Sequence, residues 1–430
     1  MRYYIVNLGC KVNAYEAKVM SDLLENNGYL KGSIDDADIY IVNTCFVTNV
    51  AESKSFQMIR KCVKKNPKLV IVCGCLTQMK ADEVKNMDGV NIVIGNKDKT
   101  KILDYINEYF ENNLKISKIY DLSNSEFENM SLNNFDKTRA FVKIQDGCNN
   151  FCSYCIIPYT RGGLKNKSKV DVINEIKTLV SNGHKEVVLT GIHTGNYNDS
   201  GYDFASLLSD AVQIEGLERL RISSIEITEI NERVIEVFKN SKVLVDHIHI
   251  PLQSGSDYIL KLMNRKYDKE YFINKINEIR SIRPLISITT DVIVGFPYET
   301  EELFLETIDT INKVGFSKLH VFPYSKREGT PAASMEEQVD EIIKKQRVHK
   351  LLELSKKLEL DYYNKFINSE VTFIPEVYKD GYLIGHTGNY LSIKVEGCKN
   401  LVNKLVKVKI NKVNYPYCEA IIVDNILVKN

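Results

Sequence analysis

The feature that most restricts the possible fold is a unit repeated within the first hundred residues, in which an apolar strand ends at a cysteine and a helical pattern follows. The strand-end cysteines are Cys10, Cys45 and Cys75. They recur at intervals close to the ~30 residues of one βαβ unit. Successive units of a parallel sheet place the carboxyl ends of their strands along one edge, where ligand sites of such sheets lie. We therefore expect a parallel sheet in which these three thiols converge on one edge.

A single cysteine after a strand would be ordinary, because free cysteine commonly packs as a small buried hydrophobe. Three at the same topological position favour a ligand site. Cys73 and Cys75 flank a glycine, so either could supply the third thiol. Cys75 matches the other two because it stands just past a strand end. Cys73 is expected to belong to the strand and to point into the core.

A second group of three cysteines follows another predicted strand. Cys148, Cys152 and Cys155 stand at the spacing C-x3-C-x2-C, too close together for a disulfide to account for all three. A structural zinc site needs a fourth ligand, and residues 156–180 contain neither cysteine nor histidine. Three thiolates on a short loop suit three irons of a 4Fe-4S cluster, with the fourth iron left for a ligand that is not protein. We therefore favour an iron–sulfur cluster over zinc.

The strand and helix patterns predict an α/β fold with three regions. Residues 1–115 predict a parallel α/β domain, whose first helix would be capped by Asn13 and Glu16. The polar residues 116–136 predict a linker or covering loop. Residues 137–366 contain six further strand–helix units, which predict a partial (βα)6 TIM-like barrel with the second cysteine group at its C-terminal mouth. Residues 367–430 change to short β runs and predict a small β-barrel.

Composition restricts the setting in which such a chain works. Hydrophobic residues make up 44% and charged residues 26% of the 430 residues, as in a soluble globular protein, and the formal charge of +1 gives no overall electrostatic case for nucleic acid. No apolar run approaches the ~20 residues that cross a bilayer. The first residues lead into a strand rather than a signal peptide. Ten cysteines then indicate metal chemistry in a reducing compartment, so we expect a cytoplasmic protein with no membrane association.

A local basic and aromatic surface is expected on the C-terminal barrel. Lys404 and Lys407 lie close together in the sequence, and Tyr390 offers a face for stacking. Basic residues interleaved with aromatic residues on a small barrel suit single-stranded or looped RNA. A barrel that only caps the preceding domain or mediates oligomerisation is the open alternative.

Over essentially its whole length, the chain resembles the radical S-adenosylmethionine (SAM) methylthiotransferases. The segments that carry the resemblance are LGCKVN (8–13) with Glu16, NTC (43–45), GC (74–75) with Gln78, DGCNNFCSYCIIPYTRGG (146–163), SGSDYILKLMNR (254–265), TTDVIVGFPYET (289–300) and FPYSKREGTPA (322–332). The C-terminal region is similar to the RNA-binding TRAM domain of that family. LGCKVN with Glu16 resembles the threonylcarbamoyladenosine branch, since the isopentenyladenosine branch typically shows GCQMN followed by Asp.

The resemblance implies two 4Fe-4S clusters, one on each cysteine group, with SAM at the open iron of the cluster on Cys148, Cys152 and Cys155. It implies that a reducing electron carrier feeds that cluster and that SAM cleavage gives a radical that removes hydrogen from C2 of the adenine. The cluster on Cys10, Cys45 and Cys75 would hold the sulfur. The expected substrate is N6-threonylcarbamoyladenosine beside the anticodon, presented by the tRNA anticodon stem-loop to a monomeric enzyme.

The expected site residues follow from the same motifs and from strand ends. Those expected in the SAM pocket are Tyr154, Gly191, Gln253, Arg265 and Asp291. Those expected to contact the tRNA are Arg161, Tyr390, Lys404 and Lys407. No catalytic side chain is expected beyond the cluster ligands. His247 and His249 share one face of their strand, as core or as pocket residues. The alternatives are methylthiolation of isopentenyladenosine, of an aspartate in a ribosomal protein, or an RNA-binding iron–sulfur sensor without turnover.

Overall fold

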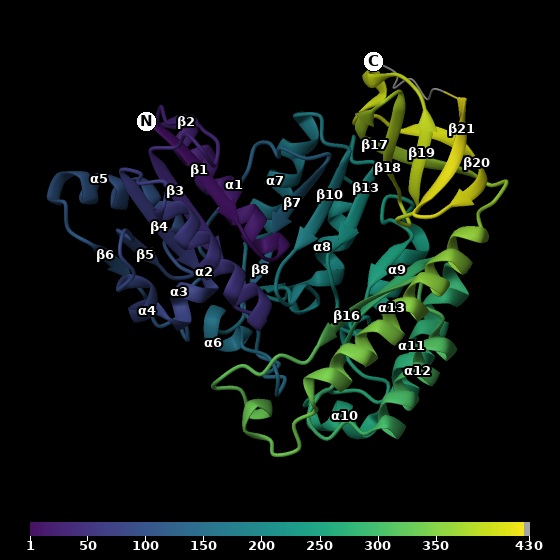
Figure 1. Ribbon diagram of the computed structural model, residues 1–430. Helices are drawn as coiled ribbons and strands as arrows, with labels where there is room; N and C mark the ends of the chain where they lie inside the picture. Colours follow the sequence, from purple (N-terminus) through teal and green to yellow (C-terminus); the bar gives the residue numbers. More distant parts are fainter. Residues whose placement is uncertain (425–430) are drawn as a thin grey trace.

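The computed structural model describes residues 1–424, so residues 425–430 of the predicted C-terminal barrel lie outside the described part. Figure 1 shows three regions in chain order: a sheet with helices on both faces, a larger half-open barrel, and a small closed barrel. The predicted α/β fold class is confirmed, including the parallel N-terminal sheet and the small β-barrel at the C-terminus. Among residues 1–424, no helix combines the length and the apolar character that a membrane span requires.

The N-terminal sheet is parallel throughout and has the strand order β2-β1-β3-β4-β5-β6. Its strands are β1 (Arg2–Asn7), β2 (Leu30–Lys31), β3 (Ile39–Thr44), β4 (Leu69–Gly74), β5 (Ile92–Ile94) and β6 (Ile116–Lys118). Its helices are α1 (Lys11–Asn26), α2 (Asn49–Val63), α3 (Cys75–Met79), α4 (Ala81–Lys85), η1 (Lys99–Lys101) and α5 (Ile102–Asn112). Alternate residues of the strands pack on opposite faces, so β3 buries Tyr40 against α2 and Ile41 against α1 and α5.

One boundary differs from the prediction. β6 lies just past residue 115 and pairs with β5 through Ile116 and Ile92, so the N-terminal sheet extends into the segment assigned to the linker. Its single buried residue, Ile116, gives too weak a pattern to identify a strand of three residues. The rest of the linker is a covering segment, because Met130 and Phe135 are buried in the core of the central barrel.

The central region has six parallel strands, as the partial (βα)6 barrel requires. These strands are β7 (Arg139–Lys143), β10 (Glu186–Thr190), β13 (Arg219–Ile222), β14 (His247–His249), β15 (Ser287–Val294) and β16 (Lys318–Pro323). They form two three-stranded sheets, β13-β10-β7 and β14-β15-β16. The two halves meet where β13 runs beside the approach to β14, at an isolated bridge between Leu220 and Leu244.

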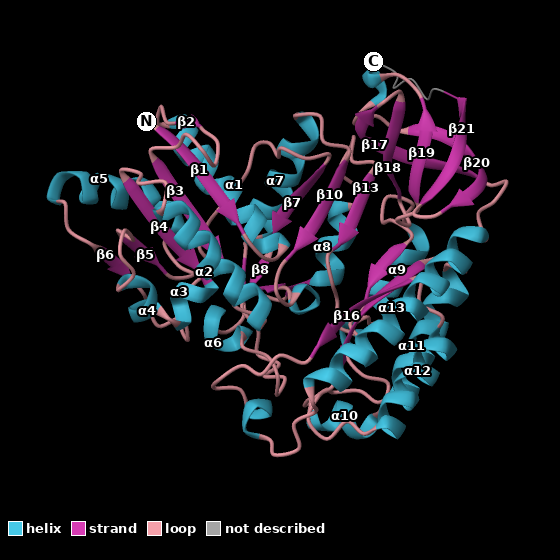
Figure 2. Cartoon of the chain, viewed as in Figure 1, coloured by secondary structure: helices cyan, strands magenta, loops and turns pink. Residues whose placement is uncertain are grey.

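Helices cover the outside of this half-open barrel, as the cyan segments of Figure 2 show. The longer helices are α7 (Lys169–Ser181), α8 (Phe204–Ala211), α9 (Glu232–Asn240), α11 (Lys269–Ile282), α12 (Glu301–Val314) and α13 (Glu341–Asn364). The shorter elements are β8 (Gln145–Asp146), α6 (Ile157–Arg161), β9 (Lys165–Asn166), η2 (Thr194–Asn196), β11 (Asn198–Asp199), β12 (Tyr202–Asp203), η3 (Ile227–Glu229), α10 (Asp257–Leu262) and η4 (Pro331–Ser334). A single large core fills the space between the strands and these helices.

The C-terminal strands close into a barrel in the order β17-β18-β19-β21-β20. They are β17 (Glu370–Lys379), β18 (Tyr382–Thr387), β19 (Ser392–Glu396), β20 (Val406–Asn414) and β21 (Tyr417–Asp424), with η5 (Lys399–Leu401) before β20. Arg221 of β13 donates to the carbonyl oxygens of Thr387 and Gly388, at 2.9 and 2.7 Å. The end of α13 packs Tyr362 and Tyr363 into the core of the small barrel. The small barrel is thus attached to both halves of the central barrel.

Candidate functional site

The first cysteine group converges on the carboxyl edge of the N-terminal sheet, as the repeated unit predicts. Cys10 follows β1 and caps α1, Cys45 follows β3, and Cys75 follows β4 as the first residue of α3. Gly9 has φ +100°, and a Cβ there would lie 3.1 Å from Cys45 Sγ, so glycine lets the end of β1 approach that thiol. Cys45 and Cys75 are buried, whereas Cys10 is exposed.

Polar side chains hold this edge together. Asn96 donates from Nδ2 to Cys75 Sγ at 3.3 Å and to the carbonyl oxygen of Thr160 in α6 at 2.9 Å. Asn13 donates to the carbonyl oxygens of Leu8 and Thr44, at 2.7 and 3.0 Å. The expected capping box is therefore wrong, since α1 begins at Lys11 and Asn13 instead joins the ends of two strands. Cys73 lies within β4 and is buried in the core on the face of α1 and α5.

The second cysteine group occupies a loop that leaves and rejoins the central barrel through the antiparallel pair β8 and β9. Cys148 Sγ lies 3.7 Å from His193 Nδ1 and accepts the backbone N–H of Asn150 at 3.4 Å. Cys152 Sγ accepts from the guanidinium of Arg265 at 3.3 Å. The second barrel half therefore supplies a cation to a loop that starts from the first half.

A buried group of charged residues lies between the two cysteine groups. It consists of Glu16 of α1, Lys99 of η1, Lys143 of β7, Asp146 of β8 and Arg161 of α6. The Arg161 guanidinium lies 3.1 Å from Glu16 Oε1 and 3.0 Å from the Asp146 carboxylate, and Lys143 Nζ lies 2.8 Å from Glu16 and 2.7 Å from Asp146. Lys99 is a further partner of Glu16.

These cations determine the charge state of the two carboxyl groups. Burial by itself would raise the pKa of Glu16, but Arg161, Lys143 and Lys99 hold it well below its ordinary value. For Asp146, Arg161 and Lys143 likewise outweigh burial and lower the pKa to about 2. Both carboxylates are therefore ionised at neutral pH. The group joins the N-terminal sheet to the loop that carries Cys148, Cys152 and Cys155.

This arrangement corrects the prediction for Arg161. The side chain is 1% exposed and binds Glu16, Asp146 and Asn13, so its guanidinium has no free face for a tRNA phosphate. Lys143 and Asp146 are further residues of the site that the sequence motifs do not single out. Their one local signal was a lysine and an aspartate at the end of an apolar strand, directly before the cysteine loop.

The five residues expected in a SAM pocket lie on two sides of the barrel mouth. Arg265 pairs with Glu226 and with Cys152, while Tyr154 packs edge-on against Phe296. Gln253 has a left-handed backbone (φ +64°), and its N–H donates to the carbonyl oxygen of Asp291 at 2.9 Å. Gly191 and the side chain of Asp291 line the central cavity described next.

A central cavity of about 680 Å³ brings the three regions together. Cys10 and Lys11 line it from the N-terminal sheet, His247 and Asp291 from the barrel strands, and Tyr390 from the small barrel. The predicted pairing of His247 and His249 on one face is confirmed, since both rings bond to Thr289 Oγ1, at 3.1 and 2.9 Å. The first cysteine group therefore opens, through Cys10, into the interior of the central barrel.

The tRNA-contact residues expected on the small barrel do not lie together. The Tyr390 ring lies 3.8 Å from the guanidinium carbon of Arg221, with its centroid 4.5 Å from that of His247. Tyr390 therefore faces the central cavity, and the expectation of a free stacking face for tRNA is wrong. Lys404 is exposed just before β20, and Lys407 of β20 pairs with Glu370 at 2.6 Å.

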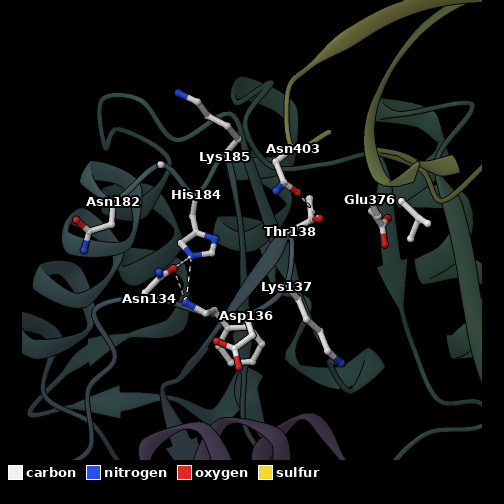
Figure 3. Close-up of a pocket in the computed structure, with 12 residues that line it drawn as sticks. Asn134, Asp136, Lys137, Thr138, Asn182, His184, Lys185, Glu376 and Asn403 are labelled. Atoms are coloured by element: carbon white, nitrogen blue, oxygen red, sulfur yellow. Dashed lines mark hydrogen bonds between the residues drawn. The ribbon is translucent and has the colours of Figure 1, made fainter. Parts of the chain in front are cut away.

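A second cavity of about 520 Å³ lies at the amino ends of β7 and β10, against the small barrel (Figure 3). Thr138 donates to Asn403 Oδ1 at 2.6 Å across it, and His184 Nε2 accepts the N–H of Phe135 at 3.1 Å. It is lined by none of the residues predicted for the site, and its contacts join the central barrel to the small one.

The two cysteine groups fit iron–sulfur clusters by the chemistry of their donors. Each group has three thiols, an N–H donor to at least one sulfur, and a nearby guanidinium, which are the features that stabilise anionic sulfur ligands. Among residues 1–424, no three His, Cys, Asp or Glu side chains gather closely enough to hold a single metal ion. Burial raises the pKa of Cys155 to about 12, so this thiol must lose its proton when iron binds.

Comparisons with known proteins agree with this geometry. The model of the Radical SAM superfamily matches residues 142–311, and that of the uncharacterized protein family UPF0004 matches residues 2–95. The threonylcarbamoyladenosine tRNA methylthiotransferase MtaB of Bacillus subtilis is 45% identical over 96% of this chain and 94% of its own length. The tRNA-2-methylthio-N(6)-dimethylallyladenosine synthase of Carboxydothermus hydrogenoformans is 36% identical over 98% of this chain and 99% of its own length.

A solved structure shares the fold at low sequence identity. The radical S-adenosylmethionine methyltransferase TsrM of Kitasatospora setae superimposes with a TM-score of 0.56 at 13% identity, over 77% of each chain. The predicted enzyme class is confirmed by the family and relatives, and the predicted cofactors, 4Fe-4S clusters and SAM, are those of this class. The chain belongs to the tRNA methylthiotransferases of the radical SAM superfamily.

Proposed function

We propose that this enzyme adds a methylthio group to C2 of N6-threonylcarbamoyladenosine next to the anticodon of tRNA. The observation that carries the proposal is that the ion pair of Arg161 and Glu16 joins the two cysteine groups, of which the first lines the central cavity through Cys10. The choice of nucleoside rests on the LGCKVN segment and on the Bacillus subtilis relative, which is more similar to this chain than the Carboxydothermus relative named for dimethylallyladenosine.

The cluster ligands follow from the two groups. Cys10, Cys45 and Cys75 would hold one 4Fe-4S cluster, and Cys148, Cys152 and Cys155 the other. Asn96 and Arg265 donate hydrogen bonds to sulfur, one in each group, and such bonds adjust the reduction potential of a cluster. When bound, the clusters and SAM supply the radical and sulfur-transfer chemistry that no side chain of this protein can perform.

The remaining residues bind and orient. Arg265 would act on bound SAM as a positive charge beside Cys152, because its guanidinium nitrogens already bond to Tyr267, Cys152 and Glu226, and Tyr154 on the same loop as Cys152 would lie near the adenine. Gly191, Gln253 and Asp291 form the opposite wall. Gly191 lets the end of β10 lie close to Gln145, because a Cβ there would lie 3.0 Å from the carbonyl oxygen of Gln145.

The small barrel is the proposed tRNA grip. Lys404 is exposed, and Lys407 lies on the neighbouring strand, so both can reach phosphates of a stem-loop. We assign residues 1–118 to the sulfur-donating domain, 137–366 to the radical-generating domain and 367–430 to the tRNA-binding domain, with the covering segment between the first two. A reducing electron carrier would supply electrons to the cluster on Cys148, Cys152 and Cys155.

Mass spectrometry of tRNA nucleosides tests the proposal. Deletion of the gene should remove 2-methylthio-N6-threonylcarbamoyladenosine and leave the unmethylthiolated nucleoside in its place, and the wild-type gene should restore it. A variant gene encoding Cys152→Ala should fail to restore it. Loss of the 2-methylthio-isopentenyl nucleoside instead would favour the function of the Carboxydothermus relative. Unchanged tRNA nucleosides would favour an aspartate of a ribosomal protein as the substrate. If, in addition, no 5′-deoxyadenosine forms, an RNA-binding iron–sulfur sensor would be favoured.

A further inference from the structure

The central cavity contains a cation without a partner. Of the two lysines that line it, Lys318 binds Glu359 at 2.9 Å, whereas Lys11 has no hydrogen bond or ion pair among residues 1–424. Among the other titratable groups in the lining, Asp291 lies 3.3 Å from His249, His386 lies 2.6 Å from Glu376, and the ring of His320 packs against that of His249. Lys11 is thus free to bind an anion that enters the cavity.

The position of Lys11 directs this charge into the barrel. Lys11 follows Cys10, at the start of α1, and Tyr390, Asp291, Arg139 and Arg221 all act electrostatically on its ammonium group. Asp291 and Tyr390 line the same cavity as Lys11, whose side chain is exposed, so its charge stands at the wall that the N-terminal sheet contributes. An anionic group beside Cys10 and inside the barrel would meet it.

A second polar group in the cavity also lacks a partner. His247 is 7% exposed, its Nε2 pairs with Thr289, and its Nδ1 is buried without a hydrogen bond. Burial and the nearby Arg221 hold the pKa of His247 well below its ordinary value, so the ring is neutral. A buried polar atom without a partner costs stability unless a ligand or water satisfies it. The cavity therefore offers one cationic and one neutral polar contact.

We propose that this cavity receives the N6 substituent of the target adenosine, that the Lys11 ammonium pairs with the carboxylate of that substituent, and that His247 Nδ1 hydrogen-bonds its hydroxyl or amide. The inference rests on the proposed function, because the threonylcarbamoyl group carries both a carboxylate and a hydroxyl. A dimethylallyl group carries neither, and in this cavity it would leave Lys11 and His247 desolvated and unpaired. Lys11 is thereby a specificity-determining residue, since rejection of a group that lacks the needed polar atoms is strong.

The test uses the holoenzyme reconstituted with iron and sulfide, and three anticodon stem-loops. Their target nucleosides are N6-threonylcarbamoyladenosine, its analogue with the threonine carboxylate replaced by a carboxamide, and isopentenyladenosine. The kcat/KM for methylthiolation is measured for each. The wild-type enzyme should prefer the carboxylate over the carboxamide about 10- to 100-fold, the range for a hydrogen bond to a charged group.

Variants separate the two contacts. Lys11→Gln should bring the ratio of carboxylate to carboxamide close to one through the loss of activity on the carboxylate, and Lys11→Arg should keep most of the preference. His247→Leu should lower kcat/KM about 3- to 10-fold for both substrates equally, because both have the hydroxyl. Lys85→Gln, which removes an exposed lysine of α4 outside the cavity lining, is the matched control. Each variant is compared with the wild-type enzyme only if both contain the same amount of iron and cleave SAM equally in the absence of RNA.

The outcomes distinguish the inference from the function on which it rests. If the wild-type enzyme uses carboxylate and carboxamide equally well, the pairing with Lys11 is wrong and the proposed function stands. If it acts on the isopentenyl stem-loop alone, the proposed function itself fails. The comparison of the carboxylate and carboxamide substrates uses the wild-type enzyme alone. The inference can therefore be refuted even if the Lys11→Gln protein is unstable.

Discussion

Arg161 and Glu16 form a buried ion pair, with 3.1 Å between guanidinium nitrogen and carboxylate oxygen, although 145 residues separate them in the chain. Glu16 belongs to the helix that follows Cys10, and Arg161 ends the helix that follows Cys155. The pair therefore fixes the distance between the two cysteine groups. Four further side chains bond to this pair: Asn13 and Asp146 to Arg161, and Lys99 and Lys143 to Glu16. The contact between the N-terminal sheet and the loop of Cys148, Cys152 and Cys155 is therefore rigid.

Replacement of Glu16 by Gln should destabilise the enzyme by about 3–5 kcal/mol, because three buried cations lose their shared carboxylate. Urea unfolding of the wild type and of Glu16→Gln measures the difference. The exposed Glu83→Gln, which removes a surface partner of Lys80, should change the free energy of unfolding by at most about 0.5 kcal/mol. Equal effects of the two substitutions would show that Glu16 is not the centre of a buried network.

The two cluster sites should load independently. Cys152→Ala is expected to abolish SAM cleavage and to retain the iron bound by Cys10, Cys45 and Cys75, so that about half of the iron remains. Cys45→Ala should show the reverse, with SAM cleavage kept and methylthiolation lost. Iron analysis and 5′-deoxyadenosine formation measure the two effects. Cys398→Ser, at an exposed thiol, is the control that should retain all of the iron. Loss of both clusters from either variant would contradict independent sites.

Cys73 and Cys75 provide a sharper test of the first cluster. Cys75→Ala should lose iron at that site, whereas Cys73→Ala should keep it, because Cys73 is buried in the core on the face of α1 and α5. The Cys73 variant should instead be less stable by about 1 kcal/mol, as expected for a small core cavity. Iron content together with a thermal unfolding curve separates these roles. Iron loss in the Cys73 variant alone would reverse the assignment.

Glu299 should make stability depend on pH. Burial raises its pKa to about 7 despite the Arg347 guanidinium 2.9 Å away. Between its ordinary value of 4.5 and about 7, the folded protein binds more protons at this group than the unfolded chain does, so its contribution to stability falls as pH rises through this window and is constant above it. The change amounts to about 3 kcal/mol. Urea unfolding at pH 5, 6, 7 and 8 should show Glu299→Gln gaining on the wild type as pH rises, and a constant difference would refute this.

Lys404 and Tyr390 should affect tRNA binding differently. Lys404→Gln should weaken tRNA binding and reduce the slope of log affinity against log salt by about 0.7–0.9, the value of one phosphate contact. Tyr390→Ala should leave the affinity for tRNA unchanged and lower thermal stability, because its ring packs on Arg221 and His247 inside the cavity. Filter binding at several salt concentrations measures the affinities and slopes, and a thermal unfolding curve measures the stability. A weaker affinity of the folded Tyr390 variant for tRNA would restore this residue to the tRNA surface.

Much of the fold was predictable because its signals are local. The strands before Cys10, Cys45 and Cys75 are short apolar runs that end at a glycine or a polar residue, and the strand order of a parallel sheet then brings the cysteines together. The strand β6 lacks such a signal because it has three residues and only Ile116 is buried. Its place in the sheet comes from pairing with β5, which no local pattern shows.

The parts of the site that the sequence did not predict depend on contacts between distant residues. Arg161 looks like a phosphate ligand until Glu16 and Asp146 are placed beside it, and Tyr390 looks like a stacking surface until Arg221 is placed against its ring. The local sequence around an arginine or a tyrosine does not show whether its side chain lies on the surface or between two regions of the fold. Its role depends on the residues that it contacts, and here those residues lie far away in the sequence.

The two halves of the central barrel meet at a seam with few backbone hydrogen bonds, at the bridge between Leu220 and Leu244 and from the N–H of Ile225 to the carbonyl oxygen of His249. Such a seam opens at a lower free energy than the ladders on either side of it. The small barrel straddles this seam, fastened to one side by Arg221 and to the other by α13. A contact that holds the small barrel in place therefore also restrains the two halves of the central barrel relative to each other, and with them the two walls of the central cavity.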